Sequence, residues 1–178
     1  MKALVFDTET TGLIKNRLLH VDKQSEIIEF YCCFVDFDEQ CFLDEAHFLF
    51  KPQRPVSDDL VKKLGITNDM LENKGRFRDQ AQTIKERIEF APTIIAHNLS
   101  FDQEMVELEF ERLGEPPPTW PAPLCIVEQT VHLKGYRLSL TELHQHLFGE
   151  PFLGAHRANI DTQALIRCCF ELYQRGLL

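Results

Sequence analysis

The chain is short of positive charge: it has 19 Lys and Arg against 28 Asp and Glu, a formal net charge of −9 over 178 residues. Proteins that bind nucleic acid by covering its phosphates with Lys and Arg are expected to be basic. The balance therefore argues against a module that coats nucleic acid along a broad basic track. Either the partner is not a polyanion, or bound cations supply the missing positive charge.

Long hydrophobic runs are missing as well. The apolar start, Ala3–Phe6, is interrupted by Asp7, and the longest other run is Phe30–Val35. Both are far shorter than the ~18 residues that a membrane span needs. We therefore predict neither a signal peptide nor an association with membranes.

The sequence has no Cys-x-x-Cys spacing, so the usual cysteine pattern of a zinc site is absent. Its six cysteines are Cys32, Cys33, Cys41, Cys125, Cys168 and Cys169. Cysteines of this kind usually behave as small buried hydrophobes in a reducing compartment. The cytoplasm is accordingly the predicted location.

Repeats, Gly/Ser linkers and blocks of like charge are also missing, and the length predicts a single domain over residues 1–178. The hydrophobic content of 44% is ordinary for a globular domain, which can bury a full core at this size. Strand-like and helix-like segments alternate along the chain. This alternation predicts an α/β layered domain.

Hydrophobic patterns and turn residues predict the individual elements. Strands are predicted at residues 3–6, 27–37, 41–51, 93–96 and 124–127. Helices are predicted after the capping residues Ser57 and Thr67, over 81–91, from the capping box of Ser100 and Gln103 to Gly114, from the capping box of Ser139 and Glu142 to Leu147, and over 158–173.

Two carboxylates follow the first buried strand. Asp7 and Glu9 are two positions apart, so in an extended strand their side chains point to the same side. Two such groups repel each other and raise a pKa unless a cation lies between them, and hard divalent cations prefer carboxylate oxygens. The alternative is a turn Asp beside a surface Glu, because this short pattern is common.

A third carboxylate, Asp102, is predicted in the first turn of the helix that follows strand 93–96. Acidic residues are favoured there by the helix dipole alone. In a parallel sheet, however, ligands gather at the carboxyl ends of adjacent strands. If strands 3–6 and 93–96 are neighbours, Asp102 faces Asp7 and Glu9.

His156 and Asp161 are five positions apart, which places them about 140° apart around one straight helix. The two side chains converge only if His156 lies in a loop after Gly154 and Asp161 in the first turns of the last helix. His156 is then a candidate general base, because an imidazole pKa suits proton abstraction near neutrality.

Three segments together resemble a known family. Residues 4–13 (Leu-Val-Phe-Asp-Thr-Glu-Thr-Thr-Gly-Leu), 95–102 (Ile-Ala-His-Asn-Leu-Ser-Phe-Asp) and 156–161 (His-Arg-Ala-Asn-Ile-Asp) are similar to the three exonuclease motifs of the DEDDh family. This DnaQ-like group includes proofreading subunits of DNA polymerases. The motifs occur in the family order over nearly the whole chain. A sister subgroup has Tyr four residues before the last Asp, where this chain has Arg157, so the His subtype is favoured.

The resemblance implies an RNase H-like fold, with a mixed central sheet of about five strands flanked by helices. It also implies a 3′→5′ exonuclease that hydrolyses phosphodiester bonds at the 3′ end of single-stranded nucleic acid and releases nucleoside 5′-monophosphates. Two cations stabilise charge on the attacking and leaving oxygens of such a reaction. The acidity of the chain then limits how a strand is held, rather than whether one is bound.

Residue by residue, the resemblance implies a metal site and a base. Asp7 bridges two Mg²⁺ ions, for which Mn²⁺ can substitute. Glu9 and Asp161 complete one metal site, and Asp102 supports the other. His156 takes the proton from the attacking water.

The resemblance also implies contacts to the strand end. Thr10 meets the terminal 3′-OH, and Leu13 wedges beside the last base. Asn98 and Phe101 shape the pocket, and Arg157 is a candidate phosphate contact.

Two features depart from the family pattern. Many relatives have His where this chain has Leu64, which bears on contacts to the terminal nucleotide. The stretch Ile14–Ser25 is longer than in compact relatives, and it is either a solvated loop or an approach to nucleic acid.

The sequence leaves the substrate and partner open. DNA is favoured over RNA, but the motifs do not report the sugar, so an RNA-trimming exonuclease is an alternative. The chain is either a free-standing nuclease or a proofreading subunit with a DNA polymerase partner. A non-catalytic binding module that accompanies a polymerase is a further alternative, although no carboxylate of the motifs is lost.

Overall fold

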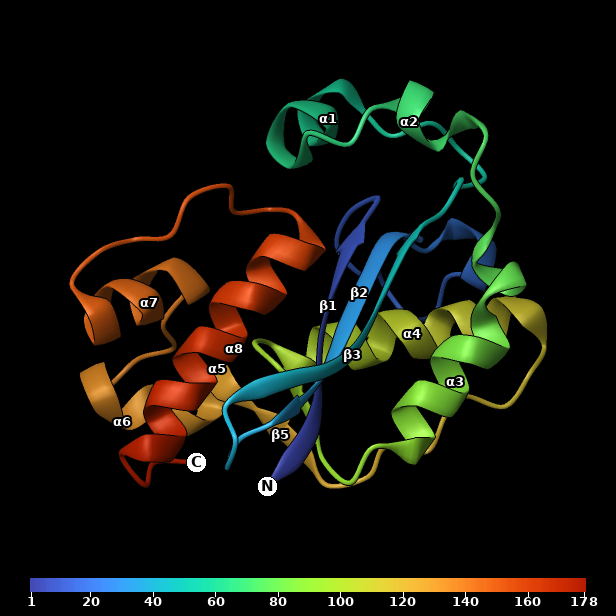
Figure 1. The fold of residues 1–178 in the computed structure, drawn as a ribbon. Coiled ribbons are helices and arrows are strands. Elements are labelled where there is room, and N and C mark those ends of the chain that lie inside the picture. The colour runs from blue at the N-terminus through green and yellow to red at the C-terminus, as the bar shows by residue number, and fades with distance from the viewer.

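The computed structural model describes residues 1–178 and contains one five-stranded mixed sheet in the order β3-β2-β1-β4-β5 (Figure 1). The strands are β1 (Lys2–Thr10), β2 (Ile27–Asp36), β3 (Cys41–Leu49), β4 (Ile94–Ala96) and β5 (Pro123–Cys125). The pairs β1–β2 and β2–β3 are antiparallel, whereas β1–β4 and β4–β5 are parallel. The predicted mixed sheet of about five strands is confirmed.

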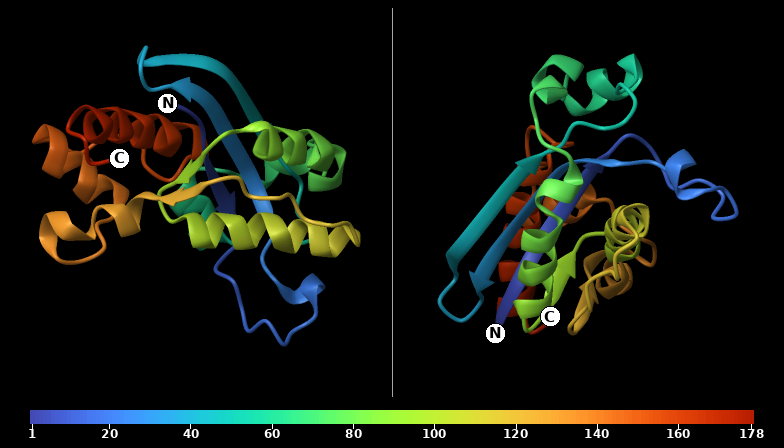
Figure 2. Two further views of the ribbon diagram at one scale, coloured as in Figure 1. Left: turned by 90° about the horizontal axis from the view of Figure 1, so that it is seen from below. Right: turned by 90° about the vertical axis from the view of Figure 1, so that its right-hand side faces the viewer.

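Helices cover both faces of this sheet, as the views in Figure 2 show. One face packs against α3 (Ala81–Phe90) and α4 (Leu99–Leu113), and the other against α7 (Leu140–Phe148) and α8 (Ala158–Gln174). The alternation along β1 divides its side chains between the two cores. Phe6 joins the core on the α4 side, and Val5 joins the core on the α8 side.

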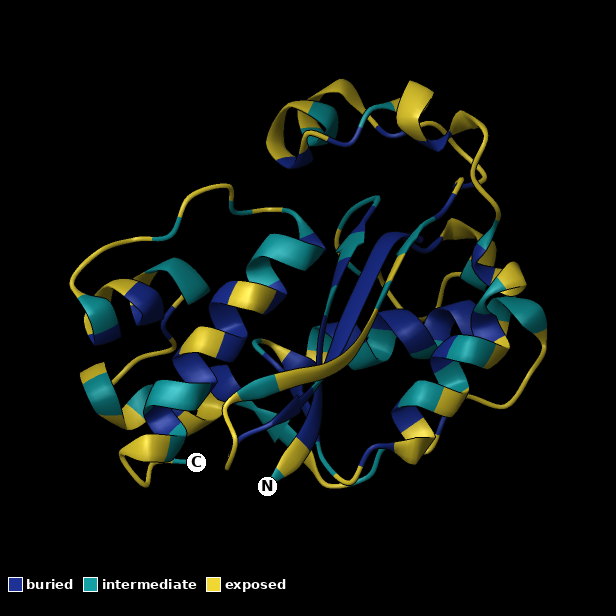
Figure 3. Cartoon of the chain, viewed as in Figure 1, coloured by how far each residue is buried: buried dark blue, intermediate teal, exposed yellow.

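Short elements connect these layers. They are η1 (Val21–Lys23), α1 (Asp58–Leu64), α2 (Asn68–Glu72), η2 (Phe77–Asp79), α5 (Ile126–Gln129) and α6 (Val131–Lys134). The segment with α1 and α2 passes over the end of the sheet where β1 finishes (Figure 1). Figure 3 shows this segment largely exposed, in contrast to the buried central strands.

Two local predictions about helices differ from the structure. The capping box of Ser100 and Gln103 is wrong, because α4 already begins at Leu99 with Asn98 at its N-cap. Leu99 is buried in the core, so the first helical turn must include it. The Ser57 hydroxyl makes no capping bond to α1, although the helix ends at Gly65 as predicted.

The predicted strand over residues 124–127 is also partly wrong. β5 ends at Cys125, and Ile126 starts α5. The Val127 amide donates to the His97 carbonyl, which turns the chain away from the sheet. Both side chains are buried, so an apolar run alone did not distinguish strand from helix here.

The second predicted capping box is confirmed. The Glu142 amide donates to the Ser139 hydroxyl at 3.2 Å and the Ser139 amide donates to the Glu142 carboxylate at 2.8 Å, which is the predicted capping box. All six cysteines are free thiols. None of the helices has both the length and the apolar composition needed to cross a membrane.

Candidate active site

The site lies where β1 ends, and strand alternation sets its geometry. Asp7 and Glu9 follow Val5 on the α8 side of the sheet, while Thr8 points to the α4 side. β1 is extended as far as Thr10, so both carboxyl groups stand on a regular strand rather than in a turn. The alternative of a turn Asp beside a surface Glu does not apply.

Asp102 reaches this strand end from the first turn of α4. β1 and β4 are parallel neighbours, with Leu4 opposite Ile94, and α4 begins shortly after β4. The Asp102 Oδ1 accepts hydrogen bonds from the Thr8 backbone N at 3.2 Å and from the Thr8 hydroxyl at 2.7 Å. With 3% of its surface exposed, Asp102 is a buried carboxyl group at the end of the central strand.

His156 and Asp161 come from the loop before α8 and from its first turn. His156 has a φ of 73°, a left-handed conformation, and its backbone N donates to the two carboxylate oxygens of Asp161 at 3.3 and 3.1 Å. This meets the condition for the two residues to converge. Ligand atoms of Glu9, His156 and Asp161 all lie within 4.8 Å of one another.

The four carboxyl groups of this site, which we call the acidic cluster (Asp7, Glu9, Asp102 and Asp161), have raised pKa values. Burial is the main cause in each case. It raises the pKa of Glu9 to about 8, that of Asp102 to about 7 and that of Asp161 to about 6. Repulsion from Asp102 and Glu9 adds to the effect of burial on the pKa of Asp7, which lies well above its ordinary value.

A set of desolvated carboxylates without a paired cation fits the requirements of a divalent metal site. Hard cations such as Mg²⁺ take carboxylate oxygens, and their charge removes the repulsion that raises these pKa values. No ion pair joins the acidic cluster to a Lys or Arg. The donor set is therefore suited to metal ions rather than to internal salt bridges.

The imidazole of His156 is suited to accept a proton. Burial, followed by the nearby positive charge of Lys63, lowers the pKa of His156 below its ordinary value. The ring is thus neutral near pH 7 and has a lone pair available. Lys63 is exposed on α1 and also lowers the pKa of Glu9, so its charge is felt across the site.

Arg157 contacts a fifth acidic residue, Glu29 of β2. Its Nη2 lies 2.8 Å from the Glu29 Oε1, and its Nε lies 3.2 Å from both carboxylate oxygens. The Ala158 amide, at the start of α8, and the His47 ring bind the same carboxylate at 2.9 and 2.7 Å. Glu29, with 0% exposure, therefore ties the segment that carries His156 to the sheet.

The other predicted contact residues lie around the same strand end. Thr10 is buried and its hydroxyl donates to the Gly12 carbonyl at 2.8 Å, whereas Leu13 is 78% exposed. Asn98 is exposed at the N-cap of α4. Phe101 packs partly against the core on the α4 side.

The two departures from the family pattern also have defined positions. Leu64 is buried in a small core with Ile28 and Ile66, so it offers the site no polar group. The stretch Ile14–Ser25 is ordered by contacts within the protein. In particular, Arg17 pairs with carboxylates of α4 at 3.3 and 3.4 Å.

The sequence reasoning missed Thr8, Glu29 and Lys63. Glu29 did leave a signal, because a carboxylate inside the apolar run Ile27–Val35 needs a partner if that strand is buried. Thr8 and Lys63 left none. Their roles depend on which strand and helix lie beside β1.

The comparisons with known proteins identify this five-stranded mixed sheet with its flanking helices as an exonuclease domain. The sequence model of the RNase_T exonuclease family matches residues 4–169. The nuclease domain of 3'hExo, a DEDDh family member bound to rAMP, superimposes with a TM-score of 0.81 at 16% identity, over 99% of this chain and 93% of that one. The zinc-bound E. coli ExoI–ssDNA complex gives a TM-score of 0.78 at 21% identity, over 98% of this chain and 41% of that one.

The chain belongs to the exonuclease family of the DEDDh, DnaQ-like type. It is 32% identical to the DNA polymerase III subunit epsilon of Pasteurella multocida over 92% of this chain and 65% of that protein. It is 32% identical to the same subunit of Haemophilus influenzae over 74% of this chain and 49% of that protein. The chain thus spans about half to two thirds of the length of these relatives.

Proposed function

We propose that this protein is a metal-dependent 3′→5′ exonuclease that removes nucleoside 5′-monophosphates from single-stranded ends, with DNA as its substrate. The observation that carries the proposal is the acidic cluster, which has no ion-pair partner: Asp7 and Glu9 lie on β1, Asp102 is hydrogen-bonded to Thr8 between them, and Asp161 has a ligand atom within 4.8 Å of Glu9. A ring nitrogen of His156 lies within 4.8 Å of the carboxylate oxygens of Glu9 and Asp161. All five residues that the family resemblance requires are present in the chain.

In this proposal Asp7, Glu9, Asp102 and Asp161 hold two Mg²⁺ ions, which Mn²⁺ can replace. The chemistry that such ions supply is stabilisation of the charge on the attacking and leaving oxygens. Thr8 fixes the Asp102 carboxylate through two hydrogen bonds, so that its oxygens keep one orientation. The role of the protein is thus to present oxygens in a fixed arrangement at a desolvated site.

His156 is the proposed general base, which removes the proton from the attacking water. The depressed pKa of its ring keeps it able to accept that proton at neutral pH. The Asp161 carboxylate binds the backbone of His156 rather than its ring, so it fixes the loop and leaves the imidazole nitrogens free.

The strand end is proposed to bind beside β1. The exposed Leu13 side chain wedges against the last base, and the backbone at Thr10 meets the 3′-OH. Asn98 and Phe101 border the same end. Because Glu29 already engages its guanidinium, Arg157 is proposed to act by positioning the His156 loop rather than by direct phosphate contact.

The test uses oligonucleotides labelled at either end. We expect 3′-labelled DNA to release labelled mononucleotide at once, and 5′-labelled DNA to shorten stepwise, with Mg²⁺ or Mn²⁺ but not with EDTA. The Asp7→Ala variant should remain folded and release nothing. Release of the 5′ label first would contradict the polarity, and wild-type turnover by Asp7→Ala would contradict the metal site.

RNA is the second candidate substrate, favoured by the likeness to 3'hExo bound to rAMP. DNA is favoured by the relatives named DNA polymerase III subunit epsilon. Matched DNA and RNA oligomers of one sequence separate the two, and a large preference for RNA would overturn the proposal for DNA. A non-catalytic binding module predicts no metal-dependent release from either.

The relatives also suggest a setting for the reaction. We propose that residues 1–178 form one exonuclease domain, working alone or as a proofreading partner of a DNA polymerase in the cytoplasm. The support is the similarity to the epsilon subunits and the six free thiols, which are typical of a reducing compartment. Co-purification with a polymerase from the source cells, compared with the Asp7→Ala protein as a folded bait, tests the partner.

A further inference from the structure

Residues 51–78 differ in charge from the rest of the molecule. This segment, which we call the basic arch, leaves the sheet after β3, contains α1 and α2, and returns at η2 (Figure 1). It contains seven of the 19 Lys and Arg but only four of the 28 Asp and Glu, a net charge of +3. Because the whole chain has a net charge of −9, the remaining residues together carry −12.

The positive charges of the basic arch are unpaired. None of its seven cations forms an ion pair with a carboxylate, whereas 8 of the other 12 Lys and Arg do. The arch cations are Lys51, Arg54, Lys62, Lys63, Lys74, Arg76 and Arg78. All except the half-buried Arg76 are exposed. Seven of the 11 Lys and Arg without an ion pair therefore lie on this one segment, where an external anion can reach the six that are exposed.

Hydrogen bonds and a small apolar core hold the basic arch in a defined conformation. Its two ends are joined by a hydrogen bond from the Lys51 amide to the Gly75 carbonyl at 2.9 Å. The Asn68 side chain ties the rising and returning halves together through the Val56 amide and carbonyl at 2.8 and 2.9 Å. A small core of Ile28, Val56, Leu64, Ile66 and Leu71 anchors it on β2. The cations are therefore held on a defined frame beside the sheet.

The basic arch spans the distance between the active site and a hollow at its base. At one end α1, which carries Lys62 and Lys63, lies over the end of the sheet where β1 finishes (Figure 1). At the other end Lys51, Arg76 and Arg78 line a cavity of about 310 Å³. A second hollow of about 360 Å³, lined by Lys51 and Arg54, adjoins it.

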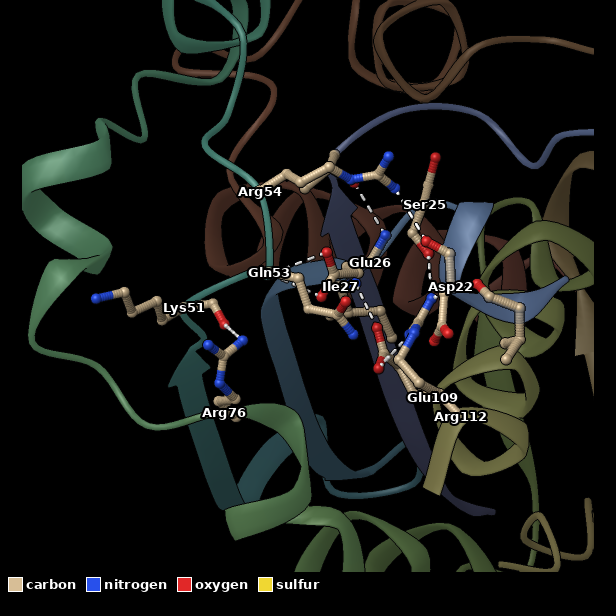
Figure 4. Close-up of polar contacts among 12 residues, drawn as sticks. Asp22, Ser25, Glu26, Ile27, Lys51, Gln53, Arg54, Arg76, Glu109 and Arg112 are labelled. Atoms are coloured by element: carbon tan, nitrogen blue, oxygen red, sulfur yellow. Dashed lines mark hydrogen bonds and ion pairs between the residues drawn. The ribbon is translucent and has the colours of Figure 1, made fainter. Parts of the chain in front are cut away.

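Two of the three carboxylates that line the first cavity, Glu26 and Glu109, accept hydrogen bonds from the protein itself, as Figure 4 shows. Glu109 pairs with Arg112 at 2.6 Å and accepts from the Ile27 amide at 2.9 Å. Glu26 accepts from the Gln53 amide at 3.0 Å. Among the cations that line this cavity, Arg112 has an ion-pair partner, whereas Lys51, Arg76 and Arg78 of the arch have none.

We propose that the basic arch binds the phosphodiester backbone of the strand whose 3′ end occupies the acidic cluster. The inference rests on the proposed function and adds the surface that holds the strand beyond the scissile bond. Exposed, unpaired cations attract phosphates independently of base sequence, with release of counterions. A segment of this length reaches only a few phosphates, which agrees with an otherwise acidic protein.

The experiment removes arch charges that support no other contact. Lys51→Gln, Lys62→Gln and Arg78→Gln are combined, since none of these three side chains donates a hydrogen bond or forms an ion pair within the protein. The matched control combines Lys23→Gln, Lys85→Gln and Lys134→Gln, which removes the same charge outside the arch. Binding of a fluorescent single-stranded DNA oligomer is measured against salt concentration in the Asp7→Ala background, which prevents degradation.

We expect the arch variant to bind roughly 10- to 100-fold more weakly at low salt, and its slope of log K against log salt to fall by about 2. The control should keep the wild-type slope. Equal slopes in the arch and control variants would overturn the inference. So would equally tight, arch-dependent binding of polyglutamate, which would make the arch a site for acidic protein segments.

A small substrate separates this inference from the proposed function. The p-nitrophenyl ester of thymidine 5′-monophosphate reports hydrolysis without a strand for the arch to hold. The arch variant with Asp7 intact should therefore cleave it at the wild-type rate. If the ester is cleaved and the salt slope of the arch variant equals that of the wild type, strand binding by the arch is contradicted and the nuclease activity is supported. If the slope depends on the arch but no ester is cleaved, strand binding by the arch is supported and the nuclease activity is contradicted.

Discussion

Two glutamates face each other on neighbouring strands of this protein, and their pKa values are shifted in opposite directions. Glu9 of β1 pairs with Glu29 of β2 in the sheet register. Burial and nearby carboxylates raise the pKa of Glu9 to about 8. Burial acts on Glu29 as well, but hydrogen bonds from His47 and Arg157 more than offset it and lower the pKa to about 2.

The difference between the two lies in their partners. Glu29 receives an Arg, a His and a helix N-terminal amide from the protein itself, which satisfy its charge permanently. Glu9 has carboxylates around it and no ion-pair partner. A carboxyl group whose pKa is raised this far costs stability at neutral pH, and a bound cation would remove that cost. In the proposed function, Glu29 therefore serves the fold and Glu9 serves the reaction.

The largest expected effect comes from Glu9→Gln, which removes a charge from the acidic cluster. We expect kcat/KM on single-stranded DNA to fall at least ~10³-fold, because stabilisation of the developing charge is worth several kcal/mol. The metal-free variant should be at least as stable in urea as the wild type, since it no longer has to take up a proton at position 9 when it folds at neutral pH. The exposed Glu39, changed to Gln, is the control and should alter neither quantity.

Glu29→Ala tests the opposite member of the pair. It leaves the Arg157 guanidinium and the Ala158 amide without their acceptor, so we expect a loss of about 3 kcal/mol in the free energy of unfolding. Activity should fall as well, because the His156 loop loses its attachment to the sheet. Glu29→Gln keeps an acceptor and should recover part of the stability. Full stability in Glu29→Ala would show that the pair does not hold α8.

Metal binding should stabilise the protein through Glu9 and leave Glu29 unaffected. Mg²⁺ at about 100 times its dissociation constant is expected to add about 2.7 kcal/mol to the free energy of unfolding. Urea titrations with Mg²⁺ and with EDTA measure this difference. Glu9→Gln should reduce it strongly. An equal gain in both proteins would place the bound metal elsewhere.

The metal-free protein should lose stability as the pH rises from 5 to 8. Over this window the folded state holds protons on Glu9, Asp102 and Asp161 that the unfolded chain has already released. The slope is therefore negative, and it is at most about 1.4 kcal/mol per pH unit for each proton. Glu29, with its lowered pKa, acts below pH 4.5 and with the opposite sign. A flat profile in EDTA would contradict the raised pKa values.

The smallest expected effect is that of Arg157→Lys. Lysine keeps the charge but cannot reproduce the forked contact with Glu29, so we expect a loss of about 1 kcal/mol in stability. The KM for DNA should stay within about twofold of wild type. A raised KM at unchanged stability would instead favour direct contact of Arg157 with a phosphate.

Much of this site could be predicted from local patterns. Two-residue alternation put Asp7 and Glu9 on one side of a strand, and the order of the three motifs indicated the family and its fold. The same reasoning failed at Ser100 and at Ile126, where core packing, rather than capping chemistry or an apolar run, set the element boundary. Local periodicity predicts the side to which a side chain points better than it predicts the residue at which a helix or strand begins or ends.

The sequence by itself determined which chemical groups are available, their order, and the side to which neighbouring strand residues point. Only the tertiary structure decided that β4 lies beside β1, which brings Asp102 onto Thr8, a residue 94 positions away. It also decided that Glu29 meets Arg157 across 128 positions, and that the basic arch passes over the end of the sheet where β1 finishes. The physical reason is that side-chain direction follows from backbone geometry within a few residues, whereas these charge pairings depend on which distant elements pack together.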